Sequence, residues 1–459
     1  MVRITSTLAV ILTSRLLNIV TAFQAYSSSE AAFYFQHQSK LFKSQKNFRI
    51  QPHYSQPEGP PYQSSTSLNL ASVEDTISEL SEERRSTLFQ SLLRDLQIEG
   101  IPLLGCDADA VHTMSAALWT TMAEISEKDD GQKVCLIMET IPTGALKAFV
   151  EDFIVLKSQT RLMNHLPELE RFSVSLVGKG VGPAFIIETR DRTDEEIAVK
   201  NARVTAEESL DATKCENGLR AFIERIVIGA EACPYTRTTD LAAVGLEKRG
   251  VPSGPVGYRF GGSSDACAAV GMFWNCVCEL LATPQEEIST TMLSLPAIGS
   301  GRTIEAHDRF AAVMELISRN LCLYRGDDVF GLVHFHPRYE RNLVHPLDKP
   351  AYGHLPPQGW LRPMLKMSGN DSGAAELTDE ELELSNFQRR SPFTAINILR
   401  ANQLDAANGG KSVVDLDVGN GVIEKASGIT TYSRNAIRLV KIGKDELLAG
   451  VEADIALTK

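Results

Sequence analysis

Between residues 219 and 337, three helix-like segments alternate with three strand-like segments. The helix-like segments carry apolar residues three or four positions apart, whereas the others are short apolar runs rich in β-branched and aromatic residues. This alternation is typical of an α/β layer, in which helices pack on a small sheet. An α/β or α+β fold is therefore expected. The helices are expected at residues 219–234, 264–284 and 303–321, and the strands at 256–262, 288–298 and 328–337.

A smaller α+β unit is expected before this layer, at residues 73–205. Its apolar periodicity predicts helices at 76–100, 110–126 and 144–166. The continuous apolar run at 133–141 predicts a buried strand between two of these helices.

A glycine-rich turn at 178–182 separates two strand-like runs of this unit. A phosphate loop would require a helix after the glycines, so that amide groups and the helix dipole converge on the anion. The sequence that follows, AFIIET, is instead β-branched and aromatic. We therefore expect a β-hairpin across residues 171–191.

The first 72 residues form a separate leader by composition. They hold six Lys or Arg residues and two acidic residues, in a chain whose net charge is -12. Residues 1–22 have a basic start and an apolar stretch that Arg15 interrupts, which predicts a signal peptide and not a retained membrane helix. Residues 23–72 are rich in Ser, Gln and Tyr, which predicts a transit peptide or disordered linker. Together they resemble the two-part plastid leader of diatoms and related algae, with a mitochondrial leader or secretion as alternatives.

Composition excludes several classes of protein. The net charge of -12 argues against a chain that covers a nucleic-acid backbone, and no integral membrane segment is expected in the mature protein. With 43% hydrophobic and 23% charged residues, the chain is expected to be soluble and globular. Its eight cysteines are sparse and form no CxxC pair, so we expect free thiols and no disulfide scaffold.

The second unit is expected to span residues 206–459, with a polar insertion at about 343–385. After the insertion, Ser391 followed by proline is a typical helix start. The stretch RRSPFTAINILRANQL therefore predicts a helix. On that helix Arg390 and Arg400 would lie ten residues apart, close to three turns, and could share a face.

The first motif with candidate chemistry is RIVIGAEACPYT, in which Cys233 and Pro234 end an apolar helix. Cys233 is a candidate reactive thiol. The negative partial charge at a helix C-terminus would raise its pKa, however, and this favours a buried, unreactive thiol.

The second motif, GLVHFHPRYERN, places His334 and His336 two residues apart. On a strand both imidazoles would lie on one face and could hold a divalent metal, the candidate cofactor of this chain. Alternatively, one histidine packs under a helix while the other hydrogen-bonds the loop. The candidate third metal ligands are Glu340, His345, Asp348 and His354.

The third and fourth motifs, NFQRRSP and ILRA, supply arginines near the expected helix start. Guanidinium groups and the free amide groups of a helix N-terminus suit a phosphate or a carboxylate. Arg390 and Arg400 are therefore candidate anion-binding residues. Alternatively, an arginine here pairs with an acidic residue of this chain.

RIVIGAEACPYT, FHPRY and NFQRRSPFTAINILR, in that order, resemble the blocks of the family called domain of unknown function 1415. The resemblance covers about residues 218–408 and implies a shared site, without an activity. Asn397 stands where the family usually has histidine, Ala401 stands where it has an acid, and His334 is outside the family pattern. The matching positions are Gly229, Cys233, Pro234, His336, Pro337, Tyr339, Asn386, Arg390, Ser391, Pro392 and Arg400.

The first functional hypothesis is a plastid enzyme that acts on a small anionic metabolite. The alternatives are a non-enzymatic binding or assembly factor, in which the motifs only fix the fold, and a metal-dependent enzyme that uses the histidine pair. In the first hypothesis the catalytic residues are His336 and Tyr339, and the substrate-binding residues are Asn386, Arg390, Ser391 and Arg400.

Overall fold

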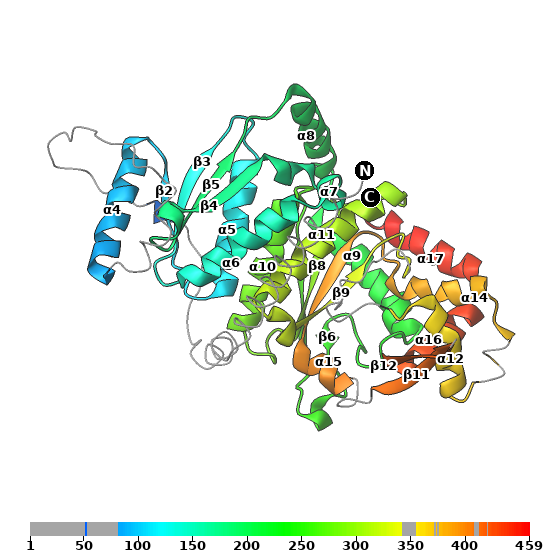
Figure 1. The fold of residues 1–459 in the computed structure, drawn as a ribbon. Helices are drawn as coiled ribbons and strands as arrows, with labels where there is room; N and C mark the ends of the chain where they lie inside the picture. Colours follow the sequence, from blue (N-terminus) through cyan, green and yellow to red (C-terminus); the bar gives the residue numbers. More distant parts are fainter. Residues whose placement is uncertain are drawn as a thin grey trace, which may run out of the picture.

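The computed structural model describes residues 51–52, 81–341, 355–370, 373, 376–407, 413–419 and 421–459. These residues form two five-stranded sheets, a separate two-stranded hairpin and the helices that cover the sheets (Figure 1). The α/β class expected from the sequence is confirmed.

The first sheet contains β1 (Gln51–Pro52), β2 (Leu103–Gly105), β3 (Lys133–Ile137), β4 (Phe172–Leu176) and β5 (Ala184–Thr189), in the order β1-β2-β3-β5-β4. β2 and β3 are parallel, and β5 pairs antiparallel with both β3 and β4. The expected hairpin is therefore present, and Gly178 and Gly180 adopt positive φ in its turn. A positive φ costs glycine little, which explains the glycine-rich sequence there.

The helices of the first unit follow the expected segments. α5 is mostly buried, whereas α8, formed by an acidic segment, has no fully buried residue. The elements are α4 (Glu82–Ile98), α5 (Val111–Ser126), α6 (Thr143–Lys157), α7 (Thr160–Met163), η2 (Pro167–Arg171), η3 (Val177–Lys179) and α8 (Asp194–Glu207).

The second sheet contains β6 (Leu241–Ala242), β7 (Gly254–Phe260), β8 (Thr290–Ser294), β9 (Phe330–Phe335) and β10 (Ala395–Arg400), in the order β6-β7-β8-β10-β9. β7 and β8 are parallel, and β10 pairs antiparallel with both β8 and β9. The expected strands at 256–262, 288–298 and 328–337 thus become β7, β8 and β9.

The helices of the second unit begin with α9 (Ala212–Phe222), which continues as the π-helix η4 (Ile223–Gly229). The expected helices at 264–284 and 303–321 are present. The remaining elements are η5 (Glu247–Arg249), α10 (Ala266–Ala282), α11 (Ile304–Leu323), η6 (Gly326–Asp328), α12 (Gln358–Met367), α14 (Asp379–Glu383), η7 (Leu384–Arg389), α15 (Ala401–Ala407), β11 (Val414–Gly419), β12 (Val422–Ala426), α16 (Ile429–Ile442) and α17 (Lys444–Ala456).

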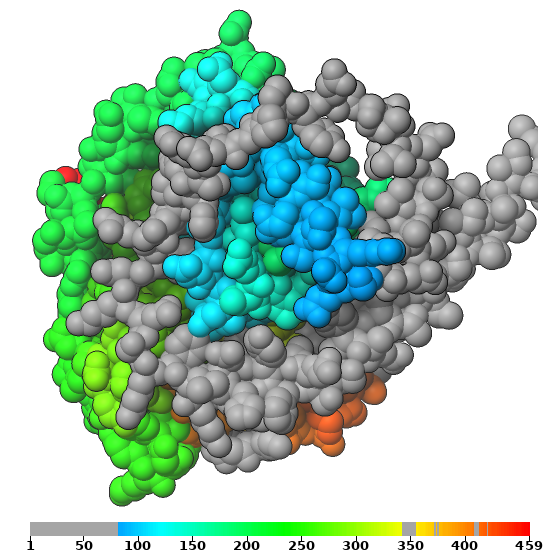
Figure 2. All heavy atoms as spheres, turned by 90° about the vertical axis from the view of Figure 1, so that its left-hand side faces the viewer, coloured from blue at the N-terminus to red at the C-terminus, as the bar shows by residue number. Residues whose placement is uncertain are grey.

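The sheets and helices form successive layers (Figure 1). α5, α6, α10 and α11 lie between the two sheets, and one apolar core joins these helices to the inner faces of both sheets. α4 covers the outer face of the first sheet and lies at the surface (Figure 2). α9, η4 and α17 contribute to the core on the outer face of the second sheet. The units expected at 73–205 and 206–459 thus share one core.

The helix expected to start at Ser391 is wrong, because residues 395–400 form the strand β10. Ala395, Ile396 and Ile398 are buried there, and β10 pairs with a strand on each side. This burial outweighs the local Ser-Pro signal. The Ser391 hydroxyl donates to Phe393 O instead of capping a helix. Arg390 therefore precedes a strand that Arg400 ends, and the two do not share a helix face.

No helix in the described ranges has the length and apolarity needed to cross a bilayer. Apart from β1, the expected signal peptide at 1–22 and transit segment at 23–72 lie outside the described residues. The leader therefore remains a prediction.

Candidate functional site

The carboxyl ends of β7, β8 and β9 and the amino end of β10 lie at one edge of the second sheet. Two hydrogen bonds join the segments that follow β9 and precede β10. His336 N donates to Arg389 O at 3.0 Å, and Arg390 Nε donates to Tyr339 O at 3.2 Å. The motifs GLVHFHPRYERN and NFQRRSP, distant in sequence, are therefore neighbours at this edge.

The His336 imidazole is fully buried and bonded at both ring nitrogens. Nδ1 accepts from Arg338 N at 2.9 Å, so the ring proton is on Nε2, which donates to Gly299 O at 2.7 Å. Burial lowers the pKa of His336 to about 4. The ring is therefore neutral near pH 7, and it ties the end of β9 to the loop before α11.

His334 on β9 and His336, the first residue after β9, lie on the same side of the chain, as their spacing of two residues predicts. The ring of Phe310, on α11, packs against both, with centroid distances of 6.0 Å and 5.4 Å. Glu340 forms an ion pair with Arg338 at 3.2 Å. Among the described residues no group of three or more metal-ligating side chains occurs. His345, Asp348 and His354 lie outside the described residues.

Arg341 is the most deeply buried cation at this edge, with a side chain in a residue only 6% exposed. Its Nε donates to Asn386 Oδ1 at 3.0 Å, its Nη1 to Pro356 O at 2.7 Å and its Nη2 to Ser385 Oγ at 2.5 Å. All of these acceptors are neutral. Burial lowers the pKa of Arg341 to about 10, because charge is costly to bury without a counter-ion.

Tyr339 lies beside this guanidinium and is 1% exposed. Its hydroxyl accepts a hydrogen bond from Leu355 N at 3.4 Å. Burial raises the pKa of Tyr339, and the positive charges of Arg389 and Arg341 act in the opposite direction. Tyr339 therefore carries a neutral phenol between two cations.

Arg390 is half-buried, and its guanidinium stacks on the Phe387 ring at 4.4 Å from the centroid. Nε is bonded to Tyr339 O, and neither Nη group has a hydrogen-bond partner among the described residues. Burial lowers the pKa of Arg390. The nearby charges of Glu340 and Glu383 oppose this shift, and those of Arg302 and Arg338 add to it. Arg302 and Arg338 are paired with Glu452 and Glu340, whereas no ion pair joins Arg390 or Arg341 to a described carboxylate.

Arg400 lies at the other end of β10, paired with Phe330. It lies five positions from Ala395, which is about 17 Å at the usual rise per residue of a strand. Its Nη2 donates to the carbonyl oxygens of Leu280, Thr283 and Ile288 at 2.7 Å, 2.8 Å and 3.1 Å. Arg400 is therefore not brought to the site of Arg390, and it instead ties β10 to the segment between α10 and β8.

Cys233 lies beyond the π-helix η4 and is half-buried, and like the other seven cysteines it forms no disulfide bond. Asn435 on α16 donates through Nδ2 to Ala232 O and to Gln388 Oε1, both at 2.8 Å. This amide connects the backbone beside Cys233 to η7, next to Arg389. Cys233 thus lies near the sheet edge that carries Arg389 and Arg390, and it makes no polar contact to that edge among the described residues.

Residues 214–357 match the family model described as Protein of unknown function (DUF1415). The match confirms the family resemblance of the motifs around Cys233 and His336. The NFQRRSP motif follows the matched DUF1415 segment in the chain and contacts it in the fold through Tyr339 and His336. No curated protein and no solved structure matches the chain.

The structure adds residues that the motifs did not indicate, above all Arg341 and Arg338. Both occur within PRYER, so the density of arginine in that stretch was an available signal. The roles of Asn386 and Ser385 as acceptors for Arg341 depend on a contact across 44 and 45 residues of sequence. Such a contact cannot be predicted from the spacing of residues in the sequence.

Proposed function

We propose that the second unit binds a small anionic metabolite, bearing a phosphate or a carboxylate, at the arginine-rich edge formed by Arg302, Arg338, Arg341 and Arg390. The observation that carries this proposal is the imbalance of charge. Arg341 and Arg390 are buried or half-buried without an ion-pair partner among the described residues. An anion at this edge would offset the cost of burying both charges.

Arg390 is the side chain best placed to contact the anion directly. Its Nε is fixed by Tyr339 O and its plane by the Phe387 ring, which leaves the two Nη groups with a defined orientation. A planar guanidinium held in this way suits bidentate contact with a carboxylate or phosphate. Arg341, with Asn386 and Tyr339, supplies a fixed positive field behind it.

A binding or assembly role without catalysis is the second candidate, and the state of His336 favours it. A general base needs a free lone pair, and the only lone pair of this imidazole accepts from Arg338 N. The enzyme hypothesis with His336 as acid or base therefore requires the 336–338 segment to rearrange when the anion binds. Tyr339 is the other candidate proton donor.

Calorimetric titration of the mature protein with inorganic phosphate, pyrophosphate and malonate, at low and at physiological salt, tests the proposal. We expect one site per chain for at least one of these anions, with affinity that falls as salt rises. Arg390→Gln should weaken binding at least tenfold, because a charge-assisted bidentate contact contributes about 1.5–3 kcal/mol.

The matched control is Arg325→Gln, which removes an exposed arginine that pairs with Asp328 at 2.7 Å. This variant has the same charge change and should bind as the wild type does. If no anion of the panel binds, or if both variants lose affinity equally, an anion site at Arg390 is contradicted.

A further inference from the structure

Four strands of each sheet share the same topology. In each unit a helix is followed by strand, helix, strand, helix and then two antiparallel strands: α4-β2-α5-β3-α6-β4-β5 in the first, and α9-β7-α10-β8-α11-β9-β10 in the second. The spatial orders β2-β3-β5-β4 and β7-β8-β10-β9 are identical, and so are the directions of these strands. The outermost strands differ, because β1 precedes α4 in the chain whereas β6 follows α9. The shorter helix α7 is the main addition to the first unit.

The strand registers align the two sheets residue by residue. Ala184 pairs with Ile137 in the first sheet, as Ala395 pairs with Ser294 in the second. From this anchor, the aligned positions bury the same kinds of side chain toward the shared core. The aligned pairs are Leu136 with Leu293, Phe172 with Phe330, Val174 with Leu332 and Ile187 with Ile398.

Backbone hydrogen bonds outside the ladders also repeat. Cys106 N donates to Ile137 O at 2.9 Å, and Gly261 N donates to Ser294 O at 2.8 Å. In the segments after β3 and β8, Met138 N donates to Pro183 O at 2.8 Å and Leu295 N donates to Thr394 O at 2.9 Å. The following turns repeat too, through Ile141 N to Met138 O and Ile298 N to Leu295 O. These aligned bonds support a common backbone framework.

α5 and α10 occupy the same place in each unit, and each has a fully buried tryptophan as its ninth residue, Trp119 and Trp274. The two helices pack directly on each other. A Cβ at Gly271 would lie 3.2 Å from Thr120 N and 3.3 Å from the carbonyl carbon of Trp119, so the backbones approach closely there. Trp119 Nε1 also donates to Asn320 Oδ1 on α11 at 2.6 Å.

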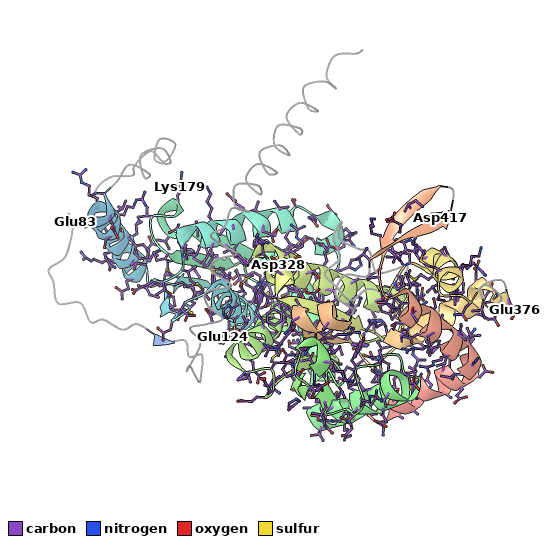
Figure 3. All side chains as sticks on the ribbon, turned by 90° about the horizontal axis from the view of Figure 1, so that it is seen from below. Glu83, Glu124, Lys179, Asp328, Glu376 and Asp417 are labelled. Atoms are coloured by element: carbon purple, nitrogen blue, oxygen red, sulfur yellow. The ribbon has the colours of Figure 1, made fainter. Side chains whose placement is uncertain are left out.

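The units differ most where β4 turns into β5 and β9 into β10. Residues 177–183 make the first connection, whereas residues 336–394 make the second and carry His336, Tyr339, Arg341, Asn386 and Arg390. Lys179, in the short connection, lies at the end of the molecule opposite Asp417 of the second unit (Figure 3). The arginine-rich edge therefore has no counterpart in the first unit.

We propose that residues 82–189 and 212–400 are two copies of one structural unit, joined through α5 and α10 as an internal dimer. The first copy is a permanent docking partner, which supports the second without an anion site of its own. The lack of an anion site in the first copy rests on the proposed function, whereas the duplication does not. The apolar face of α10 thus packs against α5, which belongs to the other copy of the same fold.

The first copy also anchors α11, the helix that follows the loop beside the candidate site. Glu168 accepts from Arg309 Nη2 on α11 at 2.7 Å and from Ala266 N at the start of α10 at 2.9 Å. α11 follows the loop that supplies Gly299 to His336 and Arg302 to the edge. The first copy therefore anchors both inner helices of the second.

The test uses the full chain with a site for a sequence-specific protease inserted between Glu208 and Asp211, in the connection after the exposed helix α8. After cleavage of the folded protein, we expect both fragments to migrate together at the uncleaved mass in sedimentation, even at micromolar concentration. Separation of the fragments upon cleavage would overturn the internal dimer, because the contact would then depend on the covalent connection.

Two equivalent substitutions supply the matched comparison in the cleaved protein. Trp119→Phe removes the bond to Asn320, whereas Trp274 Nε1 has no hydrogen-bond partner among the described residues, so Trp274→Phe removes none. We expect Trp119→Phe to weaken fragment association about tenfold more than Trp274→Phe. Equal effects would contradict the cross-copy role of Trp119, and Asn320→Ala tests the same bond from the other side.

Phosphate titration of the cleaved complex separates this inference from the proposed function. One bound phosphate, lost in Arg390→Gln and kept in Lys179→Gln, supports an anion site in the second copy alone. Two equivalent bound phosphates would contradict the one-sided site. Fragments that stay together without binding phosphate would support the internal dimer and count against the anion site.

Discussion

His336 lies in a motif typical of a catalytic histidine, yet in the structure its imidazole holds the backbone around the candidate site. Its sequence position, after a strand and before proline, fits a catalytic histidine and a structural one equally well. The bonds to Gly299 O and from Arg338 N use both ring nitrogens and define one neutral tautomer. The imidazole therefore orients Arg338 and the loop before α11.

The buried neutral ring predicts a pH dependence of stability. The folded-state pKa of about 4 lies below the ordinary value of 6.5, so the unfolded chain binds the proton more readily between these pH values. The stabilising contribution of His336 is therefore complete above about pH 6.5 and is lost as the pH falls toward 4. The shift corresponds to about 3 kcal/mol at most.

The check compares the free energy of unfolding of wild type and His336→Phe from pH 4 to 8. The difference should be largest above pH 7 and should shrink on acidification. Phe330→Leu, a change in the same strand without a titrating group, should give a difference that does not vary with pH. A constant difference for His336→Phe would show that this imidazole does not titrate as described.

In the motif NFQRRSPFTAINILR, the local sequence signals predict the wrong secondary structure. Ser-Pro is a sound helix start, yet β10 is inserted between β8 and β9 and buries three apolar residues of AINILR. Long-range pairing of this kind is absent from spacing and propensity. By contrast, the helices α10 and α11 and the strands β8 and β9 follow from local periodicity, because each presents apolar residues to one core. The strand β7 follows in the same way, with its apolar residues packed against the core on the outer face of the sheet.

Arg400 yields a prediction about how β10 is held. Its three backbone contacts secure the segment after α10, so Arg400→Lys should destabilise the fold by about 2 kcal/mol while anion binding is retained. Denaturant unfolding and phosphate titration measure the two effects. Arg325→Lys, at an exposed ion pair, is the control with no expected change. Loss of binding in a folded Arg400→Lys protein would place Arg400 in the site after all.

At the scale of the whole molecule, the arrangement of the site could be predicted only in part. The sequence motifs indicated that the end of β9 and the NFQRRSP stretch belong together, and they indicated His336, Tyr339, Asn386 and Arg390. The role of Arg341 could not be predicted, because it depends on contacts with Ser385, Asn386 and Pro356 that the fold creates. The repeat of the first unit could not be predicted either, because it is defined by topology and strand register, which only the structure shows.

The proposed anion site lies in only one of the two similar units. The first copy contributes the inter-sheet core and the anchor at Glu168, and the second contributes the long connection with its arginines. Stability and anion binding should therefore respond to different substitutions. Changes between α5 and α10 should lower the melting temperature, and changes at Arg390 should lower affinity.

The most direct test of anion binding at Arg390 is a crystal structure of the mature protein grown with millimolar selenate. Anomalous data would be collected at the selenium edge. We expect an anomalous peak within hydrogen-bond distance of the Arg390 Nη atoms, on the side facing Arg338 and Arg302. The same crystal of Arg390→Gln should lack it. Wild-type crystals without a peak at Arg390, or with an equal peak in the variant, would contradict the claim.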